Sequence, residues 1–156
     1  MKKYLLQVSD VYSYCLLPNH FHIILKFKQE TELDIEARKT RLHQPISNML
    51  NAYTKAINKR HNRRGSLFQE HLKRIKITKE TYLKNLIVYV NTNSSHHQIE
   101  DYITYKYSSY DALISNQKTS IKRDEVIQLF SDVSNFKYVL HSKKLNIDSV
   151  QELILE

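Results

Sequence analysis

Two histidines separated by a single residue are the part of this sequence best suited to chemistry. His20 and His22 lie in the apolar run LLPNHFHIILK, residues 16 to 26. Side chains on a strand point alternately to its two faces, so both imidazoles would project together. The other face, which we expect to pack against helices, then carries Phe21, Ile23 and Leu25. Two imidazoles at this spacing could bind one metal ion, or they could be ordinary histidines on a half-exposed strand.

A tyrosine and an asparagine four residues apart form a second pair of side chains with useful chemistry. After Thr78, which we expect to cap a helix, apolar residues recur at helical spacing: Tyr82, Leu83, Leu86, Ile87 and Val90. On this helix Tyr89 and Asn93 would lie one turn apart on one face. The alternative is a core tyrosine followed by an asparagine that ends the helix. Beside the histidines, however, a phenol and an amide would complete a site for phosphoryl transfer.

Basic residues are concentrated in the middle of the chain. The formal net charge is +8, and the segment from Arg38 to Lys79 holds twelve Lys or Arg against one acid, Glu70. Aromatic and imidazole side chains are interleaved with this block: Tyr53, His61, Phe68 and His71. The block could be a solvated face, or it could bind phosphates and unstacked bases. The residues expected to contact nucleic acid are Lys55, Lys59, Arg60, Arg63, Arg64, Lys73, Arg74 and Lys76.

Length and composition indicate a chain that folds without disulfides and outside membranes. At 156 residues it can bury a sizeable core, and its one cysteine, Cys15, can form no bridge within the chain. A lone cysteine fits a reducing, cytoplasmic setting. We find no export signal, and no run approaches the ~20 apolar residues of a membrane span. A membrane surface is also a poor partner, because the chain has no Trp to anchor an amphipathic helix.

The order of the expected elements indicates an α+β fold. Residues 8 to 17 are rich in β-branched and aromatic types and should pair with the histidine strand through a turn at Pro18-Asn19. A helix should span residues 45 to about 59 and end before Gly65, the only glycine. Residues 66 to 77 should form a further strand with a basic outer face. Short helices are expected at residues 111 to 115, 123 to 130 and 136 to 141.

Several short motifs, taken together, resemble one family. Residues 14 to 22 read YCLLPNHFH, residues 65 to 69 GSLFQ, residues 86 to 93 LIVYVNTN and residues 107 to 110 YSSY. In this order, across residues 12 to 141, they resemble the single-tyrosine HUH transposases, and most of all the REP-associated tyrosine transposases. Phe21 fills the middle place of the family's His-hydrophobic-His motif, whereas Ser94 stands where the family usually has proline.

The resemblance implies a metal-dependent enzyme that acts on DNA. His20 and His22 would bind a divalent metal ion, Mg²⁺ or Mn²⁺. Tyr89 would be the nucleophile and Asn93 the third metal ligand. The substrate would be single-stranded DNA folded as a hairpin, cut through a covalent 5′-phosphotyrosine intermediate that leaves a free 3′-hydroxyl. Weaker nucleophile candidates are Tyr82 and Tyr53.

The resemblance also implies an architecture. The family has a ferredoxin-like, RRM-like antiparallel sheet in which the histidine strand is central and the helices pack on one face. The transposase domain would span residues 1 to 115, without the strand and helix that precede the hairpin in the family. A helical C-terminal extension would follow at residues 116 to 156. A sheet edge left open by the missing strand would suit a homodimer.

Two other functions stay open at this point. A catalytically inactive DNA-binding domain derived from such a transposase would keep the basic block and lose only the metal or the nucleophile. A metal-dependent hydrolase that activates water would need His20 and His22 but not Tyr89. The sequence offers that hydrolase little support, because no carboxylate lies next to the histidines to serve as its base.

Overall fold

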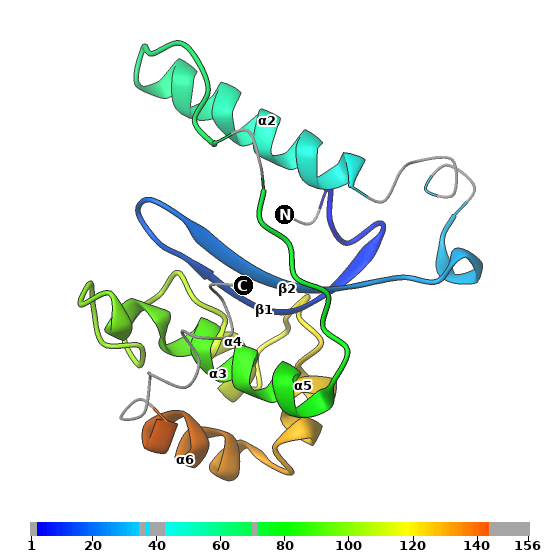
Figure 1. Cartoon of the computed structure of the whole chain (residues 1–156), viewed down its shortest axis with the longest axis vertical. Coiled ribbons are helices and arrows are strands. Elements are labelled where there is room, and N and C mark those ends of the chain that lie inside the picture. Colours follow the sequence, from blue (N-terminus) through cyan, green and yellow to red (C-terminus); the bar gives the residue numbers. More distant parts are fainter. Residues whose placement is uncertain (1–2, 35–36, 38–42, 70–71, 144–156) are drawn as a thin grey trace. The chain divides into compact units, whose positions relative to one another are not determined.

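The computed structural model describes residues 3–34, 37, 43–69 and 72–143, and within them the fold is α+β. A two-stranded antiparallel sheet is accompanied by helices that lie mostly in the second half of the chain (Figure 1). The chain divides into two compact units. Unit 1 comprises Met1–Asp10 with Lys26–Lys76, and unit 2 comprises Val11–Leu25 with Ile77–Glu156. No helix in the described ranges is long and apolar enough to cross a membrane.

The expected hairpin is confirmed. Strand β1 is Ser9–Leu16 and strand β2 is Phe21–Phe27. The turn between them is closed by a hydrogen bond that the Leu17 amide donates to the His20 carbonyl, at 2.8 Å. Proline and asparagine, which favour turns, stand at the two positions in between. His22 is therefore the second residue of β2, and His20 immediately precedes the strand.

The expectation that the histidine strand is central in the sheet is wrong for the described residues. The sheet there has only the two strands β1 and β2. Among these residues strand β1, and not β2, forms additional backbone pairs, through isolated bridges of Val11 with Ile121 and of Cys15 with Ser108. Loop backbone thus occupies the outer side of β1 and leaves β2 at the edge.

The strand expected at residues 66 to 77 is also wrong where it is described. Residues 72–76 are exposed and irregular, and residues 70–71 lie outside the described ranges. Lys73, Arg74 and Lys76 give this segment too little apolar surface to bury against a sheet. Alternation of apolar and charged residues over a few positions is a weak signal for a strand when the apolar face has nothing to pack against.

Helix α2 spans Gln44–Arg60, close to the expected range, and has proline in its first turn. Its C-cap is His61, and Asn62 then takes the left-handed conformation, with φ of 48°. Gly65, which we expected to end the helix, comes three residues later with φ of 95°. Asparagine tolerates positive φ better than most residues, so the helix can end without glycine.

Helix α3 spans Glu80–His96 and carries the predicted Tyr89 and Asn93. It is capped by Lys79 in an extended conformation, not by Thr78 as expected. An ion pair between Lys84 and Glu80, at 2.9 Å, supports its first turn. The helix continues through the polar run at residues 91 to 94, which is fully buried.

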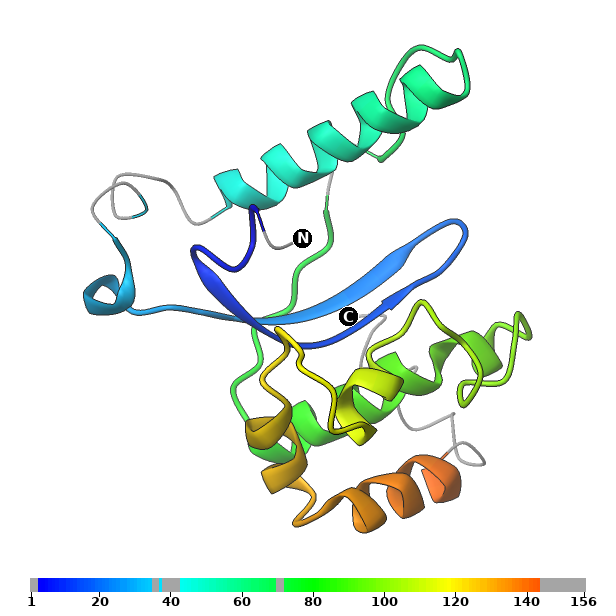
Figure 2. The ribbon, with the colours of Figure 1, turned by 180° about the vertical axis from the view of Figure 1, so that it is seen from behind.

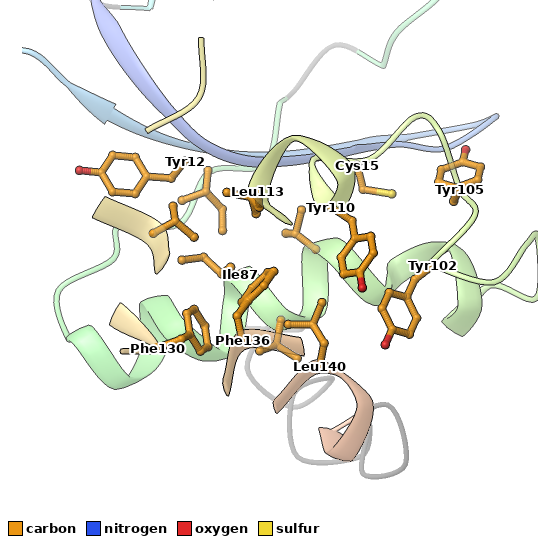
Figure 3. Packing of buried hydrophobic residues seen from close by; sticks show 14 of the residues in the cluster. Tyr12, Cys15, Ile87, Tyr102, Tyr105, Tyr110, Leu113, Phe130, Phe136 and Leu140 are labelled. Atoms are coloured by element: carbon orange, nitrogen blue, oxygen red, sulfur yellow. The ribbon is translucent and has the colours of Figure 1, made fainter. Parts of the chain in front are cut away.

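Three shorter helices complete unit 2, near the expected positions: α4 (Tyr110–Ile114), α5 (Arg123–Leu129) and α6 (Val133–Lys143). They pack with α3 below the hairpin strands (Figure 2). The core they enclose contains Ile87, Leu113, Phe136 and Leu140, each with no exposed surface (Figure 3). Residues beyond 115 therefore share one core with residues before it, while residues 144–156 of the expected extension lie outside the described ranges.

Replacement of Phe136 tests how far α6 contributes to this core. Its ring packs edge-on against Phe130, with centroids 5.0 Å apart, and stacks on Tyr110 at 6.5 Å. We expect Phe136→Ala to lower the free energy of unfolding by about 3–5 kcal/mol, because it removes a large buried ring and leaves a cavity. Chemical denaturation followed by circular dichroism measures this change.

The matched control on the same helix is Tyr138→Ala. Tyr138 is 69% exposed, so its truncation should change the free energy of unfolding by no more than about 0.5 kcal/mol. Equal effects of the two substitutions would show that α6 is not packed in this way.

Candidate nucleic-acid cleavage site

His20 and His22 lie together, as their spacing predicts. Their ring centroids are 5.1 Å apart and the rings are nearly perpendicular, at 89°. The face they share is the one packed on α3, since Ile24, the next residue on that face, is buried in the core with Ile87. The expectation that the opposite, apolar face packs against this helix layer is therefore wrong. That opposite face is only half-buried, at Phe21, Ile23 and Leu25.

A hydrogen bond orients the His20 ring. Its Nδ1 lies 2.7 Å from the side-chain oxygen of Asn19, which can only accept a hydrogen bond. Nδ1 must then carry the proton, and Nε2 keeps a lone pair available to a metal ion. Metal-binding histidines commonly have their second ring nitrogen held in this way.

One face of α3 runs opposite the two histidines. The Tyr89 ring lies 5.5 Å from the His22 ring, and the His97 ring lies 4.9 Å from the His20 ring. Four residues advance about 6 Å along a helix. Asn93 therefore stands on this face midway between Tyr89 and His97, between the two points where α3 meets the histidine pair.

Asn93 has the burial expected of a functional amide. It has no exposed surface, and neither its side-chain oxygen nor its nitrogen has a hydrogen-bond partner within the described part of the chain. The Nε2 atom of His22 is likewise buried and unpartnered there. Leaving a buried polar group unsatisfied costs about 1–3 kcal/mol, so both groups are suited to a ligand that would satisfy them.

A third contact holds the Tyr89 ring from its own helix. His96 stacks on Tyr89, with centroids 5.9 Å apart and ring planes 23° from parallel. The hydroxyl of Thr92 is 2.8 Å from His96 Nε2 and donates its own proton to the Val88 carbonyl at 2.9 Å. His96 Nε2 is therefore the donor to Thr92, and the ring is fixed against the tyrosine.

His96 and His97 are not among the site residues that the sequence analysis predicts. Their spacing from Tyr89 could have identified them. They follow Tyr89 by seven and eight residues, which places them on nearly the same helical face.

The imidazoles of the hairpin are held in their neutral form. Burial, and then the neighbouring His20 and His97, lower the pKa of His22 from its ordinary 6.5 to about 4. Burial, followed by His97, also lowers the pKa of His20. Neutral imidazoles can donate lone pairs to a metal ion without first losing a proton.

The residues present fit a divalent metal ion only if Asn93 takes part. No group of three or more His, Cys, Asp or Glu side chains is arranged to hold a metal ion within the described ranges. The unpartnered amide of Asn93 and the unpartnered nitrogen of His22 supply the donor types that such a site needs. Burial raises the pKa of the Cys15 thiol to about 11, so this thiol is protonated at neutral pH.

A closed ring of hydrogen bonds fixes the position of α3 against β1. The amide nitrogen of Asn91 donates to Ser13 Oγ at 2.9 Å, and Ser109 Oγ donates to the Asn91 oxygen at 2.8 Å. Ser13 and Ser109 are 2.9 Å apart, and since the Ser109 proton is already used, Ser13 donates. All three residues are fully buried. Asn91 lies two positions after Tyr89 on α3.

The expected DNA-binding residues belong to unit 1, whereas the histidines and Tyr89 belong to unit 2. All eight are exposed. Five lie on or just after α2, namely Lys55, Lys59, Arg60, Arg63 and Arg64, and three lie in the irregular segment after it, namely Lys73, Arg74 and Lys76. Residues 38–42, at the start of the basic block, are outside the described ranges. Of the weaker nucleophile candidates, Tyr53 is on α2 and Tyr82 on α3.

Comparison of the chain with protein-family models, with curated protein sequences and with solved structures finds no match in any of the three.

The lowered pKa of His22 predicts how stability depends on pH in metal-free protein. The unfolded histidine takes up a proton near pH 6.5, whereas the folded one does so only near pH 4. Lowering the pH from 7 to 5 should therefore favour the unfolded state and decrease the free energy of unfolding. Urea denaturation in EDTA measures this loss, which His22→Gln should reduce.

His61→Gln is the control, because His61 is exposed at the end of α2. That variant should lose as much stability between pH 7 and pH 5 as the parent protein. A parent protein equally stable at both values would contradict the burial of a neutral His22.

Proposed function

We propose that this chain is a metal-dependent single-strand DNA nuclease and strand transferase of the single-tyrosine HUH type. The observation that carries the proposal is the placement of Tyr89, 5.5 Å from His22 between ring centroids. Tyr89 is one helical turn from the amide of Asn93, which has no hydrogen-bond partner among the described residues. Tyr89 is half-buried at the edge of the apolar core. Its ring also contacts two imidazoles, those of His22 and His96.

His20, His22 and Asn93 would hold the metal ion. Bound there, a divalent ion would act as a Lewis acid on a phosphate oxygen and as a template for the scissile group. Two imidazoles favour Mn²⁺, while Mg²⁺ would depend more on oxygen ligands from the amide, water and substrate. His97, exposed at the end of α3 and 4.9 Å from His20, adds a further imidazole at the same place.

Tyr89 is the nucleophile in this proposal. Its phenolic oxygen attacks phosphorus and loses its proton, while the bond from phosphorus to the 3′ oxygen breaks and that oxygen gains a proton. One phosphodiester is exchanged for another, so the 5′-phosphotyrosine keeps the energy needed for rejoining. Attack by a 3′-hydroxyl on the same phosphorus reverses the step and releases Tyr89.

The charge fits a nucleic acid as substrate, and the family resemblance suggests that this is DNA folded as a hairpin. Between His43 and Gln69 the described chain contains no acid, and its lysines and arginines are exposed. Such a surface attracts phosphates irrespective of base sequence. A cytoplasmic protein is consistent with the unpaired Cys15.

The proposal includes the ferredoxin-like sheet of the family and a homodimer. Strand β2 is at the edge of the sheet in the described residues, so its outer side can accept further pairing. A second copy of the chain is one source of the missing strands.

Tyr89→Phe is the test of the nucleophile. The substitution removes one hydroxyl, changes little volume and keeps the ring contacts with His22 and His96, so fold and DNA affinity should be unchanged. Incubation of labelled hairpin DNA with Mn²⁺, followed by denaturing electrophoresis, should show a covalent adduct with the parent protein and none with Tyr89→Phe. Tyr82→Phe, on the same helix, is the matched control and should form the adduct.

Three results separate the alternatives. An adduct formed equally well by Tyr89→Phe would exclude Tyr89 and direct the search to Tyr82 and Tyr53. Cleavage that needs His22 but not Tyr89, without any adduct, would indicate a hydrolase that activates water. Binding without cleavage by the parent protein would indicate a catalytically inactive DNA-binding domain.

A further inference from the structure

An aromatic pair, the exposed Tyr53 and the half-buried Phe68, lies on the basic surface of unit 1. Tyr53, in the middle of α2, is 54% exposed. The ring of Phe68 lies beside it, with centroids 6.1 Å apart and ring planes at 41°. If the two rings only formed a small core, they would cover one another, yet more than half of Tyr53 remains accessible to solvent.

The loop after α2 is built to bring Phe68 back to the helix. It reverses direction at the end of α2 and returns along it, as both views of the ribbon show (Figures 1 and 2). The side chain of Asn58, on α2, donates to the Gly65 carbonyl at 2.9 Å, and the backbone carbonyl of Asn58 accepts from the Arg63 amide at 3.0 Å. Ser66 Oγ donates to the Phe68 carbonyl at 2.6 Å.

Gly65 supports this return through its backbone conformation. Its φ is 95°, and a side chain placed there would meet nothing within 4 Å. The glycine is therefore needed for its φ and not for space. The aromatic pair consequently depends on a defined loop geometry.

Three arginines lie on the helix that carries Tyr53 or in the loop that carries Phe68. Arg60 lies seven residues after Tyr53, on the same face of α2, and Arg63 and Arg64 belong to the returning loop. All three are exposed, and no acidic residue lies between His43 and Gln69. A flat ring next to positive charges is suited to an unpaired nucleotide, whose base can stack while its phosphates meet the guanidinium groups.

We propose that Tyr53, backed by Phe68, stacks one unpaired base of a single-stranded nucleic acid while Arg60, Arg63 and Arg64 bind the adjoining phosphates. The choice of DNA as that nucleic acid rests on the proposed function. The stacking site itself does not depend on the proposed function, because this site involves no metal ion, no Tyr89 and no histidine of the hairpin.

The experiment measures binding in EDTA, where cleavage does not interfere. The probe is a hairpin DNA with a single-stranded flank, labelled for fluorescence anisotropy and carrying 2-aminopurine at successive positions of the flank. Tyr53→Leu should raise the Kd about 5- to 150-fold and abolish quenching of one 2-aminopurine, since stacking on a ring is lost. Tyr53→Phe keeps the ring and should bind as the parent does.

Two controls separate stacking from charge. Tyr138→Leu removes another exposed tyrosine, on α6, and should leave the Kd unchanged. Arg63→Ala with Arg64→Ala should weaken binding to every sequence and flatten its salt dependence, whereas Tyr53→Leu should leave the salt dependence as it is.

An unchanged Kd and unchanged quenching in Tyr53→Leu would overturn the stacking site. The same flank made of RNA separates this inference from the proposed function. Tighter binding of the RNA, weakened equally by Tyr53→Leu, would support the stacking site while contradicting DNA as the substrate.

Discussion

The hydrogen-bonded ring of Asn91, Ser13 and Ser109 is the constraint on which the site depends. It links α3, β1 and the start of α4 in a place fully shielded from water, and each member both donates and accepts. A slip of α3 by one residue would rotate Asn91 away and leave buried polar atoms unsatisfied, at about 1–3 kcal/mol each. The ring therefore fixes which face of α3 meets the hairpin, and with it the position of Tyr89.

The candidate site, which depends on this orientation of α3, combines polar groups that are costly to bury. His22 and Asn93 have polar atoms out of contact with water and without partners in the described chain. Burial, and then the neighbouring His20 and His97, lower the pKa of His22 and keep it neutral. An ordinary core would replace such side chains with apolar ones. Polar groups retained at this cost are typical of functional sites, where a ligand supplies the missing partners.

Much of the fold was predictable because its signals are local. The hairpin followed from β-branched residues around Pro18-Asn19, and α2 and α3 followed from helical periodicity. The errors concern tertiary packing. The described part of residues 66 to 77 forms no strand because its charged side chains leave too little apolar surface to bury. Which strand is at the edge depends on the backbone groups with which β1 pairs, and no local pattern records that choice.

The candidate site shows the same division. Spacing alone predicted that His20 lies beside His22 and that Tyr89 lies near Asn93. The roles of His96 and His97 follow only from ring contacts in the structure, of His96 with Tyr89 and of His97 with His20. The YSSY motif is a second example. In the sequence this motif contributes only to the family resemblance, whereas the structure gives Ser109 a physical role in holding α3.

The most direct test of the central claim is to locate the covalent bond between protein and DNA. After reaction with hairpin DNA and Mn²⁺, nuclease digestion followed by trypsin should leave a nucleotide on the peptide from Asn85 to Lys106, which holds Tyr89, Tyr102 and Tyr105. Fragmentation in the mass spectrometer assigns the modified residue. The account predicts a 5′-phosphotyrosine at Tyr89; a nucleotide on Tyr102 or Tyr105, or on a peptide outside this range, would contradict it.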